Sequence, residues 1–357
     1  MKIKKEILRD YSIILVVVIL GLILLLMKNN VADGVKKGLE MCGNILIPSL
    51  FPFMALSSFA VRSGVFDRLN KSVSSLIERV FRLPGQCLPV LFFGFVGGYP
   101  VGANIIAELY DKGEISENDA RHLLAFCVNP GPAFVVTAVG GMILRSEEAG
   151  KVILFSVCLS SLITGIVYGL FRKKPMYGGI NVFGKRNISQ SVVDAAFSSS
   201  KSIFSVCVWV LLFSAFSEIV AAFIKNEKLL YIFQSFSEVT TGVESAVKSG
   251  GIAFVSAVVA FGGLCVMCQI LPTIKKCGIK AYEYLGFRIL NALLSFLITK
   301  TVLLFVDIPV DVFSDAGKSL WSYTAPSSAM LLIAGAVLIF DVSSKQTENL
   351  KLWDITG

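Results

Sequence analysis

Residues 93–116 read FGFVGGYPVGANIIAELYDKGEIS, an apolar run with a glycine pair and a proline at its centre. Proline lacks a backbone N–H donor and glycine accepts turn dihedrals, so a helix through Gly97, Gly98 and Pro100 should break there. Inside a membrane, broken backbone persists only where protein buries it or where it lines a polar cavity. In a membrane protein, the apolar segment 87–110 should therefore enter the bilayer and return on the same side.

The composition of the chain predicts that it lies in a membrane. Its 357 residues are 55% hydrophobic and 16% charged, and its mean hydropathy is +0.74, unlike a soluble domain. A membrane span needs about 20 predominantly apolar residues. Candidate segments lie at 11–27, 39–61, 87–110, 121–144, 152–171, 203–224, 251–274, 282–306 and 325–340. We therefore predict an all-α integral membrane protein with about eight or nine membrane segments.

The charges of the loops predict the topology of the segments in the membrane. Short cytoplasmic loops carry an excess of Lys and Arg. If every apolar run crossed the bilayer, the basic stretch 172–201 would lie outside, whereas a re-entrant 87–110 places that stretch and the basic loop 62–82 inside. The net charge of +8 resides in such loops, so nucleic acid is not an expected partner. Lys275, Lys276 and Lys280 do not fit this topology, because it places them outside. If the segment 251–274 crossed the bilayer completely, the orientation of the later segments would reverse.

The predicted topology divides the chain into five parts. They are an N-terminal anchor helix and loop (1–38), a first half (39–171), a basic cytoplasmic linker (172–202), a second half (203–306), and a terminal span with a tail (307–357). The basic start precedes no small-residue cleavage motif, so we expect the first helix to be retained as an anchor.

The second half is a faint copy of the first. A shift of 168 places Phe93-Gly94 on Phe261-Gly262, and a shift of 162 places Asn129 on Asn291. An odd number of elements between the halves predicts that the second is inverted. Interrupted segments at matching positions of two halves are the pattern that points to a transporter's binding site.

Broken helices supply a physical basis for solute binding. Their N-terminal amides attract anions, and their freed carbonyls attract cations. The candidate solute-binding residues at the breaks and on the facing elements are Gly97, Gly98, Tyr99, Gly102, Asn129, Gly131, Gly262, Gly263 and Asn291. The alternative explanation for the glycines is close helix packing.

Charged and hydroxyl side chains extend this set. Glu238 precedes Thr240 and Thr241, and this group is a candidate for contacting a polar solute or carrying a proton; the alternative is a solvated acid at the interface. Lys300 lies in the apolar run 296–306, where a charge is costly. It is a candidate for binding an anion, although its side chain is long enough to reach the interface. Arg288 is a further candidate of this kind.

Motifs for metal or catalytic chemistry are missing from the sequence. Cys265-x-x-Cys268 has no second cysteine pair, and His122 is the only histidine. A zinc site or a zinc-protease motif needs more ligands than these. We therefore expect neither a cofactor nor an enzyme activity.

At the interrupted segments and at several stretches around them, the chain resembles the bacterial sporulation integral membrane proteins with nucleoside-recognition gate domains. These proteins are distant relatives of concentrative nucleoside transporters. The likeness covers about residues 39–306. The stretches that carry it are LFPFMALSSF (50–59), FRLPG (81–85), the opening stretch 93–116, LLAFCVNPGPAF (123–134), EVTTG (238–242) and FGGL (261–264). Asn291-Ala292-Leu293 lacks the Pro-Gly-Pro that follows Asn129, so the site is expected to be asymmetric.

The resemblance implies a role in moving dipicolinate toward the developing spore of an endospore-forming bacterium. We therefore expect a cell-membrane transporter of a small polar or anionic solute that works by alternating access, in the outer forespore membrane during sporulation. The solute and the lipid bilayer are the expected partners. A nucleoside or nucleobase carrier is the alternative in the same class, favoured by Glu238, because such an acid meets sugar hydroxyls in the nucleoside-transporting relatives. A non-transporting scaffold for spore assembly is the alternative in another class.

Overall fold

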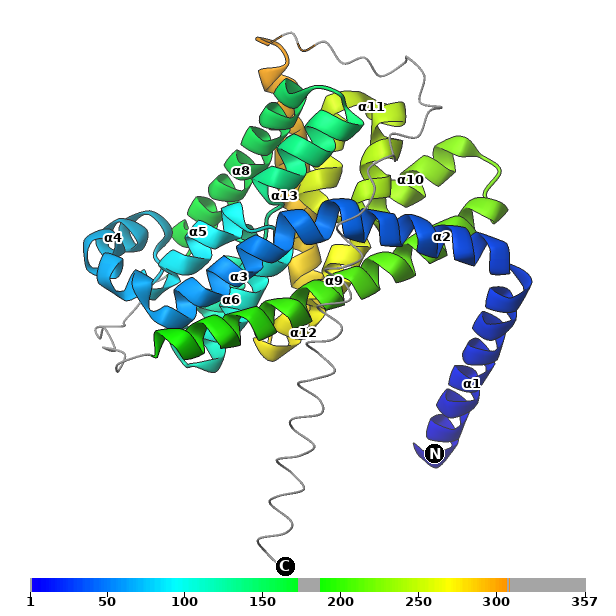
Figure 1. Ribbon diagram of the computed structural model, residues 1–357, viewed down its shortest axis with the longest axis horizontal. Helices are drawn as coiled ribbons and strands as arrows, with labels where there is room; N and C mark the ends of the chain where they lie inside the picture. Colours follow the sequence, from blue (N-terminus) through cyan, green and yellow to red (C-terminus); the bar gives the residue numbers. More distant parts are fainter. Residues whose placement is uncertain (1, 173–186, 307, 309–357) are drawn as a thin grey trace, which may run out of the picture.

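The computed structural model describes residues 2–172, 187–306 and 308, and within these residues it contains helices and no strand (Figure 1). In chain order the helices are α1 (Lys2–Leu26), α2 (Lys28–Met41), η1 (Cys42–Leu46), α3 (Ile47–Ser63), α4 (Val65–Phe81), η2 (Gly85–Cys87), α5 (Leu88–Val96), α6 (Tyr99–Asp111), α7 (Glu117–Phe126), η3 (Ala133–Ile143), α8 (Glu147–Leu170), α9 (Ile188–Phe223), α10 (Glu227–Ser237), α11 (Val239–Phe261), α12 (Gly263–Lys276) and α13 (Ala281–Val302). The terminal span predicted at 325–340 lies outside the described residues.

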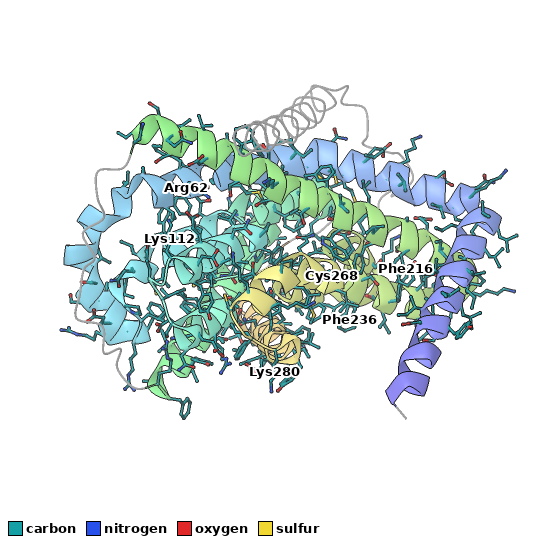
Figure 2. All side chains as sticks on the ribbon, turned by 90° about the horizontal axis from the view of Figure 1, so that it is seen from below. Arg62, Lys112, Phe216, Phe236, Cys268 and Lys280 are labelled. Carbon is teal, nitrogen blue, oxygen red and sulfur yellow. The ribbon has the colours of Figure 1, made fainter. Side chains whose placement is uncertain are left out.

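Several helical stretches of the described chain are long and apolar enough to cross a membrane. The five stretches are Lys28–Ser63, Glu147–Leu170, Ile188–Phe223, Val239–Lys276 and Ala281–Val302. Large apolar side chains such as Phe216 and Phe236 point outward and are about half exposed (Figure 2), as expected for a surface that lipid surrounds. The chain is therefore a multi-pass membrane protein. The predicted segments 87–110 and 121–144 are broken into shorter helices and are not among the five.

The longest helices form a close antiparallel pair. α2, η1 and α3 follow one another almost without interruption and run beside α9 (Figure 1). At Gly34 an added Cβ would lie only 2.6 Å from the Cα of Ala215, so glycine is what lets the two backbones approach. Lys37 and Glu218 form an ion pair of 2.5 Å further toward the end of α9.

Two boundaries differ from the sequence prediction. The loop expected before residue 39 is helical, because α2 begins at Lys28. The linker expected over 172–202 is shorter, because α9 begins at Ile188, where the Asn187 side chain accepts hydrogen bonds from the backbone N–H groups of Ser189 and Gln190. The first turns of α9 are polar, so hydropathy alone does not reveal them.

The break predicted at Gly97 and Gly98 is present, and the chain turns back there. Gly98 has a φ of 91°, a conformation that residues with a side chain rarely adopt. An added Cβ at Gly102 would lie 3.2 Å from the Cα of Gly94, so α5 and α6 pack side by side. Eight residues of continuous helix would separate these two glycines by about 12 Å. α5 and α6 therefore form a helical hairpin.

Three further segments interrupt the helices. The stretch 127–132, which contains the Asn-Pro-Gly-Pro motif, separates α7 from η3, and residues 127–131 of it are non-helical, as predicted. Gly262 and Gly263 have φ values of 82° and 77° and separate α11 from α12, and Gly251 kinks α11 with a φ of 68°. α13 runs unbroken through Asn291, in agreement with the missing Pro-Gly-Pro.

Candidate functional site

The first break, at Gly97 and Gly98, and the second break, at Gly262 and Gly263, come together at Tyr99. The hydroxyl of Tyr99, the first residue of α6, donates a hydrogen bond to the carbonyl of Val259 on α11. The Tyr99 ring also covers Gly262, where an added Cβ would lie 3.2 Å from the ring atom Cε1. One aromatic side chain of the first half therefore contacts the broken element of the second half.

The hairpin tip packs against the unwound stretch 127–132. An added Cβ at Gly131 would lie 3.3 Å from both the backbone N of Gly98 and the carbonyl O of Val96. Gly94 and Gly102 both face the carbonyl of Cys127 too closely for any side chain. Close backbone packing thus explains Gly102 and Gly131, whereas Gly98 and Gly262 are required by their left-handed backbone.

Arg288 of α13 connects the unwound stretch to the second break. Its Nε donates to the carbonyl of Phe261 at 3.1 Å, its Nη1 donates to the carbonyl of Val128 at 2.6 Å, and its Nη2 donates to the carbonyl of Ala260. The guanidinium carbon lies 5.7 Å from the centre of the Tyr99 ring. The carbonyls of Ala260 and Phe261 belong to the C-terminal end of α11, which carries partial negative charge, and the carbonyl of Val128 lies in the unwound stretch. All three favour a cation there.

The guanidinium of Arg288 is buried without an acidic partner. Only 2% of Arg288 is exposed, and in the described part of the chain no carboxylate lies within ion-pair distance of it. A guanidinium has five N–H donors, so two remain beyond the three bonds to carbonyls. Tyr284, one helical turn earlier on α13, is 1% exposed, and its hydroxyl has no partner among the described residues. The site therefore contains donors without acceptors.

Asn129 and Asn291 both bond to the last turn of α7, next to the unwound stretch. Asn129 Nδ2 donates to the carbonyl of Phe126 at 2.7 Å, and Asn291 Nδ2 donates to the carbonyl of Ala125 at 2.9 Å. Both side chains are buried. Each amide thus satisfies a carbonyl at the C-terminal end of α7, where helical hydrogen bonding stops. In this conformation both asparagines position the site and do not face an open space.

Glu238 caps α11 beside the second break. Its carboxylate accepts hydrogen bonds of 2.9 Å from the backbone N–H groups of Thr240 and Thr241, and the Thr240 hydroxyl also donates to it at 3.1 Å. An added Cβ at Gly263 would lie 3.2 Å from the Cα of Glu238. The predicted cluster of Glu238 with its two threonines is therefore present, and helix capping accounts for its internal bonds.

Lys300 lies apart from this cluster. It is exposed in the last turn of α13, and its ammonium lies 5.4 Å from the ring centre of Phe296. The structure instead brings together the glycine breaks, Tyr99, Arg288 and Tyr284. From the sequence, Arg288 was named as a further candidate and Tyr284 was not named. A signal for both was available, because polar residues recur on one buried face of α13 at Tyr284, Arg288, Asn291, Ser295 and Thr299.

The same regions match known proteins. A family model described as Gate, nucleoside recognition, matches residues 45–227, which include the first hairpin and the unwound stretch 127–132. The chain is 23% identical over 302 residues to the sporulation integral membrane protein YlbJ of Bacillus subtilis (strain 168), and the alignment covers 72% of this chain and 74% of that relative. No solved structure matches the chain.

Proposed function

We propose that this chain, which belongs to the nucleoside-recognition Gate family and crosses the membrane several times, transports a small anionic solute. The observation that carries the proposal is Arg288, a buried cation at the meeting point of the unwound stretch and the second break, with no carboxylate beside it in the described residues. Burying a charge without a counter-charge is costly, and carbonyl dipoles offset only part of that cost. A bound carboxylate would supply the missing charge.

The surrounding groups fit an aromatic carboxylate. The two remaining N–H donors of Arg288 and the hydroxyl of Tyr284 are complementary to carboxylate oxygens. The ring of Tyr99, which already lies over the guanidinium, offers a face for stacking. Dipicolinate has two carboxylates on an aromatic ring, so it is the solute that we propose. The relative that is named as a sporulation integral membrane protein supports a role in sporulation. We propose in addition that the chain lies in the outer forespore membrane.

The proposed mechanism is alternating access between two inverted halves. The corresponding positions Asn129 and Asn291 reach adjacent carbonyls of α7, and the long stretch Lys28–Ser63 runs antiparallel to α9. Such relationships are expected of an inverted repeat. The described site is closely packed, so we propose that the solute enters after the halves move and the hairpin tip separates from Gly262.

A nucleoside carrier is the second candidate. It is favoured by the description of the family, nucleoside recognition, and by Glu238 beside the second break. A neutral nucleoside would gain little from Arg288 and would depend on the carboxylate of Glu238. The two candidates therefore differ in the charge that the solute needs.

Uptake into proteoliposomes tests the proposal. Purified protein is reconstituted, and the uptake of labelled dipicolinate and of labelled uridine is compared in the same preparation, with protein-free liposomes as the control. We expect saturable uptake of dipicolinate and little uptake of uridine. Uptake of uridine alone would promote the nucleoside carrier, and uptake of neither solute would remove the transporter proposal for both.

A further inference from the structure

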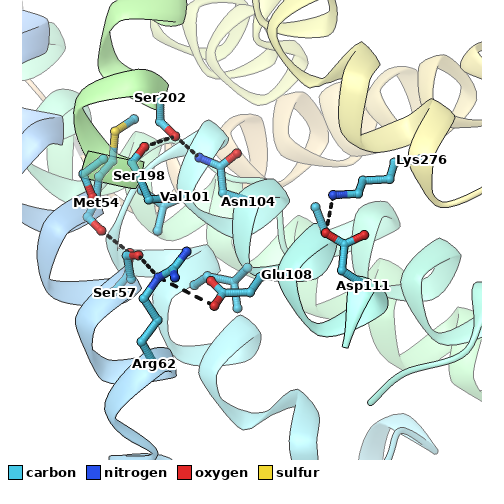
Figure 3. Close-up of a pocket in the computed structure, with 14 residues that line it drawn as sticks. Met54, Ser57, Arg62, Val101, Asn104, Glu108, Asp111, Ser198, Ser202 and Lys276 are labelled. Carbon is cyan, nitrogen blue, oxygen red and sulfur yellow. Dashed lines mark hydrogen bonds and ion pairs between the residues drawn. The ribbon is translucent and has the colours of Figure 1, made fainter. Parts of the chain in front are cut away.

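A polar cleft opens at a distance from the breaks. It has a volume of about 220 Å³ and lies between α3, α6, α9 and the end of α12 (Figure 3). None of the candidate residues named from the sequence lines it. Serines of α3 and α9 and Asn104 of α6 make much of its wall polar. A polar hollow in a membrane protein is a place where a solute or water gains hydrogen bonds.

Helix α6 links this cleft to the first break. Val101 lines the cleft, and an added Cβ at Gly97 would lie 2.6 Å from the Val101 atom Cγ1. Val101, on the wall of the cleft, is therefore about one helical turn from the hairpin tip. α3 and α6 belong to the first half and Lys276 of α12 belongs to the second half, whereas the serines of α9 that line the cleft lie in the stretch 172–202 between the halves.

One buried hydroxyl of the cleft has no partner. Ser199 of α9 is 2% exposed, and its Oγ makes no hydrogen bond within the described residues. Across the cleft Asn104 Nδ2 donates to Ser202 Oγ at 2.9 Å, which leaves its second N–H for another acceptor. A buried donor without a partner, such as the Ser199 hydroxyl, is rare in folded proteins. Together with the exposed amide of Asn104, it fits a ligand that presents oxygen acceptors.

The charges at the cleft are balanced. Arg62 pairs with Glu108 at 3.7 Å, and Lys276 pairs with Asp111, so two cations face two anions. Figure 3 shows the two pairs reaching α6 from opposite neighbours, α3 and α12. Because both cations already have acidic partners, a carboxylate here would be held by hydrogen bonds from neutral side chains and would gain less than it would from a guanidinium. Weak binding is suited to a place that a solute occupies only in passing.

We propose that this cleft is an outer site, meaning a site at a distance from the breaks, and that it binds a carboxylate of the transported anion before the anion reaches the breaks. The inference rests on the proposed transport of an anionic solute. Ser199 and Asn104 donate to the carboxylate oxygens. Movement of the two halves then transfers the solute along α6 toward Gly98 and Arg288.

Uptake kinetics with Ser199→Ala test the outer site. Losing one hydrogen bond from a hydroxyl to a carboxylate should raise the half-saturation concentration for dipicolinate about tenfold, the lower end expected for a hydrogen bond to a charged group, while the maximal rate is retained. The matched control is Ser200→Ala, since Ser200 is also buried on α9 but lies outside the cleft and donates to the carbonyl of Ala196. Because the Ser199 hydroxyl has no partner in the described protein, its removal should leave folding unchanged.

Protection from labelling gives a second readout that does not need transport. In a background without the eight natural cysteines, dipicolinate should slow the reaction of Ala107→Cys with a water-soluble maleimide, because Ala107 lines the cleft but donates nothing to the ligand. It should not slow the reaction of Lys112→Cys, which lies near the end of α6 outside the cleft.

The outcomes separate the two proposals. If the wild type transports dipicolinate but Ser199→Ala matches it in kinetics and Ala107→Cys is not protected, the outer site is wrong and transport stands. If protection is seen without transport, the cleft binds the anion and the transporter proposal is lost. Protection by uridine and not by dipicolinate would overturn the carboxylate assignment.

Discussion

Asn129 and Asn291 accept hydrogen bonds of 2.6 Å each from Ser161 and Thr164, which lie on neighbouring turns of α8. Two corresponding positions of the proposed halves are thus held by one helix. Thr164→Val should leave the Asn291 carbonyl oxygen buried and unpaired and should destabilise the protein by about 1–3 kcal/mol. Thermal unfolding in detergent measures this loss. Ser160→Ala is the control, because the Ser160 hydroxyl donates only to the carbonyl of Val157; an equal loss there would show that the inter-helix bond has no special role.

The glycines at the first break should not tolerate a large side chain. Gly98→Leu combines a positive φ with an added Cβ that would meet the Cδ2 of Leu50 at 2.7 Å, and Gly131→Leu would push the hairpin tip away from the unwound stretch. We expect both variants to insert into the membrane but to lose dipicolinate uptake. Gly286→Leu on α13 is the matched control, because nothing lies within 4 Å of its added Cβ. Normal uptake by both variants would move the site elsewhere.

Acid should destabilise the fold through His122. Burial lowers the pKa of His122 to about 4; its Nε2 lies 2.7 Å from the carbonyl of Gly165, and Arg172 lies 3.1 Å from its Nδ1. Because the unfolded chain binds the proton near the ordinary pKa of about 6.5, the neutral ring stabilises the fold above that pH. This stability, on the order of 3 kcal/mol, should be lost as the pH falls from about 6.5 to about 4.

Comparing wild type with His122→Gln across this pH range isolates the effect of the imidazole. Glutamine keeps an N–H donor for Gly165 but does not titrate. The difference in melting temperature between the two proteins should shrink or reverse as the pH falls. A constant difference would show that His122 does not titrate in this range. The lowered pKa also argues against His122 as a group that changes charge near neutral pH.

The sequence predicted the breaks well, because their cause is local. Gly97, Gly98 and the Asn-Pro-Gly-Pro motif interrupt a helix through their own dihedrals and missing donors, wherever the rest of the chain lies. The start of α9 at Ile188 was not predicted, since its first turns are polar and the Asn187 cap is the only signal. Hydropathy finds apolar runs, not helices.

The candidate site was predicted in part, because its polar contacts join distant segments. Arg288 contacts Val128, 160 positions away, and no local pattern reveals such a contact. The buried polar face of α13 would have favoured Arg288 over Lys300, since Lys300 falls outside the series that ends at Thr299. The cleft beside Asn104 depends on four helices and has no counterpart in any single motif.

Arg288 and Lys300 give the sharpest test of the anion site, because both are cations of α13 and only Arg288 is buried. Arg288→Met removes a charge-assisted contact and should weaken dipicolinate binding roughly 10- to 150-fold, corresponding to about 1.5–3 kcal/mol. Lys300→Met should bind and transport like the wild type. Arg288→Lys keeps the charge but cannot reach all three carbonyls, so it should retain part of the activity and also reports on folding. Competition by unlabelled dipicolinate measures these affinities. Loss of uptake in Lys300→Met with normal uptake in Arg288→Met would return the anion site to Lys300. If Glu238→Gln abolished the uptake of uridine alone, the result would favour the nucleoside carrier.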